Sequence, residues 1–101
     1  MHEGLDIASR MHSNVIAPAD GIVIRSGRDH GLGVLMEIDH GYGVVSRYGH
    51  NSKNIVKVGD HVVRGQKVAY VGNTGRSTGP HLHYEVLLNG IPVNPMRYIF
   101  E

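Results

Sequence analysis

This sequence of 101 residues contains no cysteine. No disulfide can therefore cross-link the fold, and any metal site must use nitrogen and oxygen ligands. The absence suits an oxidising compartment as well as a reducing one, so it does not place the protein in a cell. No apolar run approaches the roughly 18 residues of a membrane span. The N-terminus does not resemble a signal peptide.

An excess of charge of one sign is also lacking. The 10 basic and 9 acidic side chains leave a formal net charge of +1. This balance offers no basic stripe for nucleic acid and no acidic tail, so we expect no nucleic-acid partner. The length suits one domain with a modest core. Because Met1 and His2 lead directly into motif-like sequence, we expect residues 1–101 to be a single domain excised from a longer chain.

Helical periodicity is missing too, since no stretch of eleven residues sustains it and the only plausible helical turn lies near residues 95–99. Instead, 14 glycines separate short runs rich in β-branched residues. Their spacing predicts an all-β fold, an antiparallel sandwich or open barrel with Gly-rich hairpins and loops and little or no helix. The predicted strands are residues 14–17, 21–26, 33–39, 43–48, 55–58, 61–63, 67–72, 81–88 and 91–93. Between the last two, Asn89-Gly90 predicts a two-residue hairpin turn.

Residues 79–86 (GPHLHYEV) carry the most informative pattern. His81 and His83 are two residues apart in a run that otherwise reads as a buried strand, so their side chains share one face. Two neutral imidazoles are costly to desolvate unless each has a partner, and a divalent metal suits them. A pair of surface histidines on a half-exposed strand is the simpler interpretation of this pattern alone.

The N-terminal residues supply further metal ligands. His2 and Asp6 lie four residues apart, with Gly4 between them permitting a tight bend. Together with His83 they make two nitrogens and one oxygen, the three-ligand set with an open position that a catalytic zinc requires. Taken singly, His2 is compatible with a frayed terminus and Asp6 with a turn or cap.

Several motifs occur in a fixed order from His2 to about Phe100. They are His2-x-Gly4-x-Asp6, residues 15–21 (VIAPADG), Tyr48-x-His50, Val58-Gly59-Asp60 with Gly65-Gln66, Gly72-x-Thr74-Gly75, residues 77–83 (STGPHLH) and Val93-Asn94-Pro95. With these motifs the chain resembles the lysostaphin/LytM-type zinc metallopeptidases, which cut peptidoglycan peptides. Matches in this order across nearly the whole length are far more specific than any single motif.

The resemblance implies a role for each matching residue. His2, Asp6 and His83 match the zinc ligands of the family, and His50 and His81 match two histidines that act in catalysis without binding the metal. Zinc would polarise the scissile carbonyl and lower the pKa of its bound water, and an imidazole would transfer the proton. Which of His50 and His81 is the general base stays open.

The implied function is that of a zinc metalloendopeptidase, a cell-wall hydrolase that cuts peptidoglycan cross-links or stem peptides. The implied location is the cell envelope, periplasmic or extracellular. The resemblance is also compatible with an upstream regulatory or wall-binding segment in the parent protein. Whether glycyl-glycine bridges or D-alanyl cross-links are cut stays open.

Two departures from the family pattern stand out. Asn51 replaces the leucine that usually follows Tyr-x-His, so we expect a change at the rim of the cleft. The lead-in residues before His2 are missing, which can weaken metal binding.

Three alternatives compete with this interpretation. A non-catalytic LytM-type module that regulates other wall hydrolases would typically lose ligands or catalytic histidines, whereas all five residues are kept here. A biotinyl or lipoyl carrier is suggested by residues 56–69, but residues 71–74 offer no lysine to modify. A cupin-type site would need a glutamate at position 87, which is Leu87.

Other polar residues have simpler explanations. His40 shapes a turn or is satisfied in the core. Glu85 falls on the same face as His83, with a partner that the sequence does not identify. Residues 73–78 form a polar loop before His81, either binding substrate backbone or forming a solvated turn.

Overall fold

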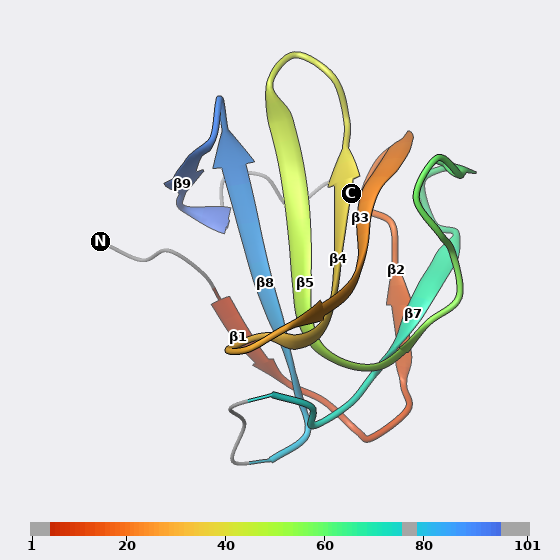
Figure 1. The fold of residues 1–101 in the computed structure, drawn as a ribbon, viewed down its shortest axis with the longest axis vertical. Helices are drawn as coiled ribbons and strands as arrows, with labels where there is room; N and C mark the ends of the chain where they lie inside the picture. Colours follow the sequence, from red (N-terminus) through yellow and green to blue (C-terminus); the bar gives the residue numbers. More distant parts are fainter. Residues whose placement is uncertain (1–4, 76–78, 96–101) are drawn as a thin grey trace.

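The structure, a computed structural model, describes residues 5–75 and 79–95 (Figure 1). These ranges contain nine strands and no α-helix, which confirms the all-β prediction. No helix long and apolar enough to cross a membrane occurs among them. The strands are β1 (Leu5–Ala8), β2 (Asn14–Ile16), β3 (Gly21–Asp29), β4 (Gly33–Asp39), β5 (Val44–Asn54), β6 (His61–Val62), β7 (Lys67–Val71), β8 (His81–Leu88) and β9 (Ile91–Val93).

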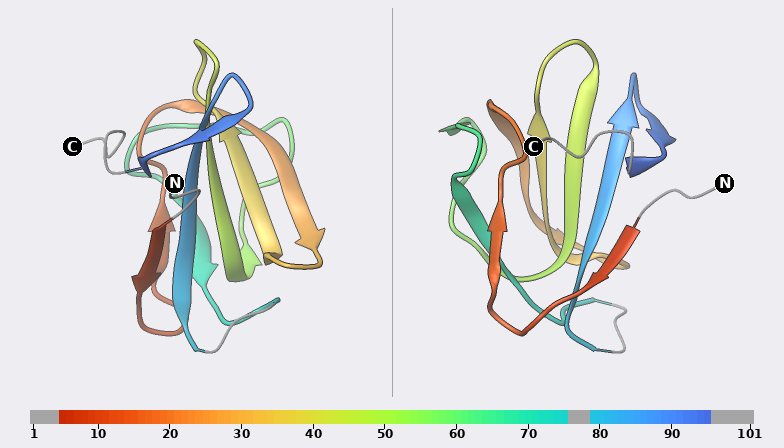
Figure 2. Two further views of the ribbon diagram at one scale, coloured as in Figure 1. Left: turned by 90° about the vertical axis from the view of Figure 1, so that its left-hand side faces the viewer. Right: turned by 180° about the vertical axis from the view of Figure 1, so that it is seen from behind.

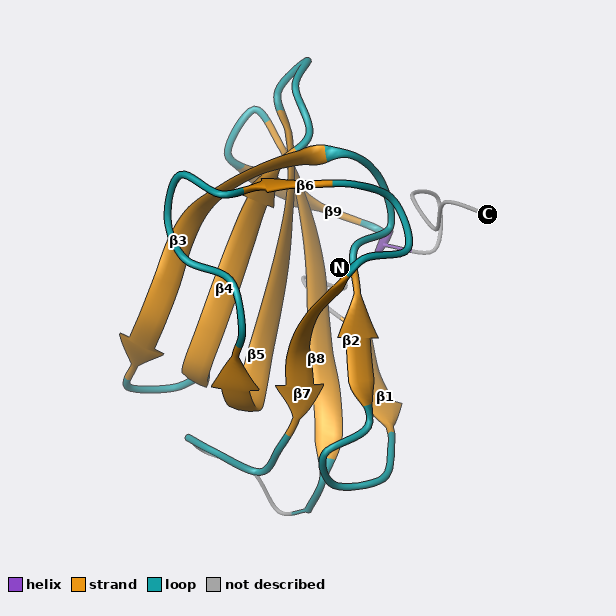
Figure 3. Ribbon diagram, turned by 90° about the vertical axis from the view of Figure 1, so that its right-hand side faces the viewer, coloured by secondary structure: helices purple, strands orange, loops and turns teal. Residues whose placement is uncertain are grey.

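All strand pairs are antiparallel, and the main sheet has the order β1-β8-β5-β4-β3-β6. Strand β7 pairs with both β2 and β5, and β9 pairs with β8. Strands β8, β5, β4 and β3 lie side by side in one layer, and β7 and β2 cross in front of them as a second layer (Figures 2 and 3). The sheet therefore folds back on itself.

The fold-back is made within β5. Residues 44–49 of this strand pair with β8 on one side, whereas Asn51, Lys53 and Asn54 pair with β7. The change of partner falls at His50, whose φ of 61° is unusual for a residue other than glycine. His50 thus lies where β5 leaves β8 and begins to pair with β7.

The core lies between the two layers and draws on nearly every strand. Tyr48 of β5 and Tyr84 of β8 pack there with their ring centroids 5.5 Å apart. Because side chains alternate along a strand, burying Tyr84 and Val86 places the intervening residues of β8 on the outer face. That face carries the polar residues discussed below.

The predicted strand at residues 55–58 is wrong. In the structure β5 continues to Asn54, and a turn follows in which Lys57 N–H donates to Asp60 Oδ2 and Gly59 has a φ of 93°. Strand β1 was not predicted, because its four residues are too few to show a period. The Asn89-Gly90 turn is confirmed, with positive φ values of 52° and 81°. The helical turn expected at 95–99 lies outside the described residues except for Pro95.

Candidate active site

Three polar side chains follow one another on the outer face of β8. His81, His83 and Glu85 are two residues apart, and the side chains between and after them turn to the core side. Register along the sheet is fixed wherever one face is buried, since a slip by one residue would expose the core. The apolar residues of β8 therefore hold the polar ones in place.

Strand β1 brings Asp6 to the same spot. Asp6 is the direct partner of His83 in the β1–β8 ladder, so the two side chains share one face. Asp6 Oδ1 lies 2.6 Å from His83 Nδ1 and 3.5 Å from His81 Nε2. Three of the five site residues predicted from the sequence thus meet at this edge of the sheet. His2, the predicted ligand nearest the terminus, lies outside the described residues.

His50 completes the group from β5. Its ring centroid is 4.8 Å from that of His81 and 5.9 Å from that of His83. The side chain is buried, and its backbone N–H donates to Leu32 O at 2.6 Å. A positive φ at a buried, functional position is the kind of local strain that surrounding contacts must hold.

Backbone carbonyls set the tautomers of both predicted catalysts. His50 Nδ1 lies 2.6 Å from Thr74 O, and His81 Nδ1 lies 2.8 Å from Gly79 O. Because a carbonyl oxygen only accepts, each Nδ1 carries the proton. Each Nε2 then has the lone pair when the ring is neutral. These contacts have no signature in the sequence, since they involve main-chain atoms.

The loop that holds His50 is pinned at Thr74, although Asn73 and Gly75 beside it are exposed. Thr74 Oγ1 donates to Asn51 O at 2.6 Å and accepts from Val34 N–H at 3.0 Å. A Cβ added at Gly33 would come within 2.5 Å of Gly75 N, so the two segments pass in direct contact. Of the two expectations for this loop, the solvated turn is wrong at Thr74.

Asn51 does not lie at the rim of the cleft, contrary to the sequence-based expectation. Its side chain is fully buried, and its Nδ2 donates to Asn54 Oδ1 at 2.8 Å. Asn54 in turn donates to Leu35 O at 2.8 Å. The substitution of leucine by asparagine thus creates a buried polar contact beneath His50.

Carboxylates surround His83 and shift its ionisation. Hydrogen bonds to Glu85 and then to Asp6 raise the pKa of His83, against the opposing effect of burial. The hydrogen bond from His83 lowers the pKa of Asp6. Burial would raise the pKa of Glu85, but the hydrogen bond from His83 and the charge of Arg47 outweigh it and lower the pKa. These carboxylates stabilise the imidazolium form of His83 relative to a free imidazole.

Comparison with known proteins identifies the family of this chain. Residues 1–95 match peptidase family M23. The chain belongs to that family. Peptidoglycan DD-endopeptidase ShyA of Vibrio cholerae is 44% identical to the M23 chain over 96 residues, which are 95% of this chain and 22% of ShyA. DD-carboxypeptidase/endopeptidase Mpg of Neisseria meningitidis is 45% identical over 96 residues, again 95% of this chain and 22% of the relative.

Solved structures confirm the resemblance to lysostaphin-type peptidases. The catalytic domain of the antimicrobial peptidase lysostaphin from Staphylococcus simulans superposes with a TM-score of 0.91 at 33% identity, covering 98% of this chain and 79% of that one. A zinc-containing peptidase from Vibrio cholerae gives a TM-score of 0.91 at 43% identity, covering 94% and 29%. The M23 chain thus spans most of the lysostaphin domain but 22% of the length of ShyA and Mpg.

The donor atoms of this M23 domain suit zinc, although within residues 5–75 and 79–95 no three histidine or carboxylate side chains are arranged to hold a metal. His83 Nδ1 donates its proton to Asp6 Oδ1 in a hydrogen bond of 2.6 Å. A divalent cation that displaced this proton would gain one oxygen and one nitrogen ligand, both of types that zinc accepts. The third predicted donor is His2.

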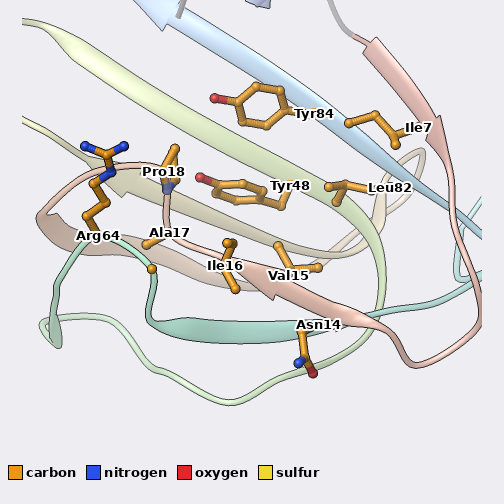
Figure 4. A pocket seen from close by; sticks show the side chains of 11 residues that line it. Ile7, Asn14, Val15, Ile16, Ala17, Pro18, Tyr48, Arg64, Leu82 and Tyr84 are labelled. Atoms are coloured by element: carbon orange, nitrogen blue, oxygen red, sulfur yellow. The ribbon is translucent and has the colours of Figure 1, made fainter. Parts of the chain in front are cut away.

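An apolar pocket of about 450 Å³ lies on the opposite side of β8 (Figure 4). Leu82, Tyr48 and Tyr84 line it together with residues of β2, and no described lining residue is a histidine or a carboxylate. His40, the other histidine considered from the sequence, lies 2.8 Å from Asp20 O and 2.7 Å from Ser46 Oγ, so both nitrogens of its ring are satisfied within the fold. The cluster of histidines and carboxylates around His83 therefore lies on the face away from this pocket.

Proposed function

We propose that this protein is a zinc metalloendopeptidase that hydrolyses peptide bonds in peptidoglycan cross-links or stem peptides. The observation that carries the proposal is the convergence of Asp6, His83, His81 and His50 on one face of a family M23 fold. The names of ShyA and Mpg support a DD cross-link as the bond that is cut. A peptidoglycan substrate supports a location in the cell envelope, periplasmic or extracellular.

In this proposal His2, Asp6 and His83 hold the metal. When bound, zinc would polarise the scissile carbonyl and activate water. His50 and His81 are the catalytic residues, because each keeps its Nδ1 proton on a carbonyl oxygen. A neutral ring can accept a proton at Nε2, and a protonated ring can donate one to the leaving amine or stabilise the oxyanion.

A non-catalytic M23 module that regulates other wall hydrolases is the alternative. Such a module has no need to keep acid–base groups beside its metal ligands. His50 is held in a costly backbone conformation, and both catalytic histidines have defined tautomers. These features support the enzyme over the regulator. An upstream regulatory or wall-binding segment remains part of the proposal for the whole protein.

Digestion of chemically defined peptidoglycan fragments tests the function. The zinc-loaded protein is incubated with purified cross-linked muropeptides, and the products are identified by mass spectrometry. We expect new amino termini at the cross-link, released about 10²- to 10⁴-fold more slowly by His81→Ala. Zinc-loaded protein that releases no amino termini would overturn the proposal. So would new reducing sugar ends as the only product, because those require glycosidase chemistry.

A further inference from the structure

A row of alternating charges crosses the outer face of the sheet beside the candidate active site. Glu85 of β8 is paired with Arg47 of β5, Arg47 with Glu37 of β4, and Glu37 with Arg25 of β3. Each pair is directly opposite in its ladder, so the four side chains share one face on four adjacent strands. The row begins two residues from His83 and ends at an exposed arginine.

The contacts along the row become weaker away from the site. Arg47 Nη1 lies 2.9 Å from Glu85 Oε1, and Arg47 Nε lies 2.8 Å from Glu37 Oε2. Arg25 Nη1 is 3.6 Å from Glu37 Oε2. The exposed fraction of the side chain is 11% for Glu85, 12% for Glu37 and 50% for Arg25. Two carboxylates are thus held in a shielded position by a single guanidinium.

Glu85 uses its other oxygen to bind the imidazole of His83. Glu85 Oε2 lies 2.7 Å from His83 Nε2, while Oε1 is occupied by Arg47. A carboxylate only accepts, so His83 Nε2 carries a proton and points along the sheet. The ring is thereby oriented with Nδ1 toward Asp6, at 2.6 Å. Only Nδ1 can then serve as a metal ligand.

We propose that Glu85 is a positioning residue for His83, and that Arg47 and Glu37 hold Glu85 in place. The inference rests on the proposed metal site and extends it beyond the ligands. A carboxylate on the distal nitrogen of a ligating histidine fixes its tautomer and raises its basicity, and loss of such a partner typically costs about 10- to 100-fold in metal affinity. Shielded ion pairs add little net stability on their own. We therefore infer that the effect of this row is to orient the ring of His83.

Zinc affinity measured against a competing chelator tests the proposal. Glu85→Ala removes the acceptor, so we expect about 10- to 100-fold weaker zinc binding. Glu85→Gln keeps an acceptor oxygen of nearly the same shape and should lose less. Arg25→Ala is the matched control, because it lies in the same row but at the exposed end, and its affinity should equal that of the wild type. Unchanged affinity in Glu85→Ala would overturn the inference.

Nitrogen chemical shifts of the histidine rings supply a second readout that a purely structural role would not move. In the zinc-loaded wild type, His83 should bind metal through Nδ1 and keep a slowly exchanging proton on Nε2. In Glu85→Ala that proton should exchange rapidly. Metal on Nε2 of His83 in the wild type would overturn the inference while leaving the proposed peptidase intact. Failure of the wild type to bind zinc at all would instead overturn the proposed metal site.

Discussion

At the scale of single residues, the four site side chains have distinct neighbours and therefore distinct expected roles. His83 is bound on both ring nitrogens by carboxylates, whereas His50 and His81 are each anchored through Nδ1 by a backbone carbonyl. A carboxylate pair orients a metal ligand, and a carbonyl anchor leaves an acid–base nitrogen facing the site. Substitutions should separate these two kinds of histidine.

His83→Ala should lose both zinc and activity, because it removes the nitrogen of a proposed zinc ligand. His50→Ala and His81→Ala should keep zinc while the turnover rate falls by about 10²- to 10⁴-fold, the usual contribution of general acid–base or oxyanion assistance. Metal content and cleavage rate, measured on the same preparations, show which histidines bind zinc and which act in catalysis. An empty site in His81→Ala with full zinc in His83→Ala would show that the two roles are reversed.

Thr74→Val should lower activity without loss of zinc. The substitution removes the hydroxyl that bridges Asn51 O and Val34 N–H, while keeping the carbonyl that accepts from His50. Loss of these hydrogen bonds should lower the free energy of unfolding by about 1–3 kcal/mol and loosen the anchor of His50. Thr74→Ser keeps the hydroxyl and is the control. Denaturant unfolding and cleavage rates that match the wild type in Thr74→Val would contradict this role.

At the scale of the elements, β5 is the part that joins fold and site. Its pairing partner changes from β8 to β7 at His50. The start of β4 and the loop before β8 meet at Thr74, whose carbonyl accepts from His50. The position of His50 therefore depends on how closely the β4 start approaches residues 72–75. Gly33 and Gly75 make this approach possible because neither has a Cβ.

Gly33→Ala should destabilise the protein and reduce activity together. Its φ is 66°, and the added Cβ would meet Gly75 N and Thr74 at 2.5 Å. A strained φ alone costs about 1–2 kcal/mol, and the clash adds to it. Gly31→Ala is a matched control in the same loop, since nothing lies within 4 Å of its Cβ and its φ is not positive. Equal melting temperatures for the two variants would refute the argument.

At the scale of the whole molecule, the two layers close over a core that contains two tyrosines. Burial raises the pKa of Tyr84 to about 12, and burial also raises that of Tyr48 despite its hydrogen bond to Ser46. Both hydroxyls ionise more readily in the unfolded chain, where the tyrosine pKa is about 10. Above about pH 10 the unfolded chain therefore releases phenolic protons that the folded chain still holds.

Stability should fall as the pH rises from about 10 towards 12. Below about 10 both states keep the phenolic protons and the contribution is complete; above it the unfolded state releases protons that the folded state retains. Chemical denaturation at a series of alkaline pH values measures the effect, and Tyr84→Phe should flatten the decline. A free energy of unfolding that stays constant to pH 11 would contradict the assignment of these buried hydroxyls.

Local patterns in the sequence were sufficient for much of this protein. Alternation in residues 81–88 identified β8 and placed His81 and His83 on one face, because side-chain direction in a strand depends only on position along it. Asn89-Gly90 identified the final hairpin, because positive φ is a property of those residues themselves. The order of short motifs indicated the family. Each of these signals is contained within a few neighbouring residues.

Only the tertiary structure decided how distant segments meet. Asp6 and His83 are 77 residues apart, and the pairing of β1 with β8 makes them neighbours. The partners of Glu85, unidentified from sequence, are set by the registers of four strands. The anchor of His50 is a main-chain carbonyl, which has no signature in residue type. Register and strand partners depend on which faces are buried together, a property of the folded sheet and of no single stretch of chain.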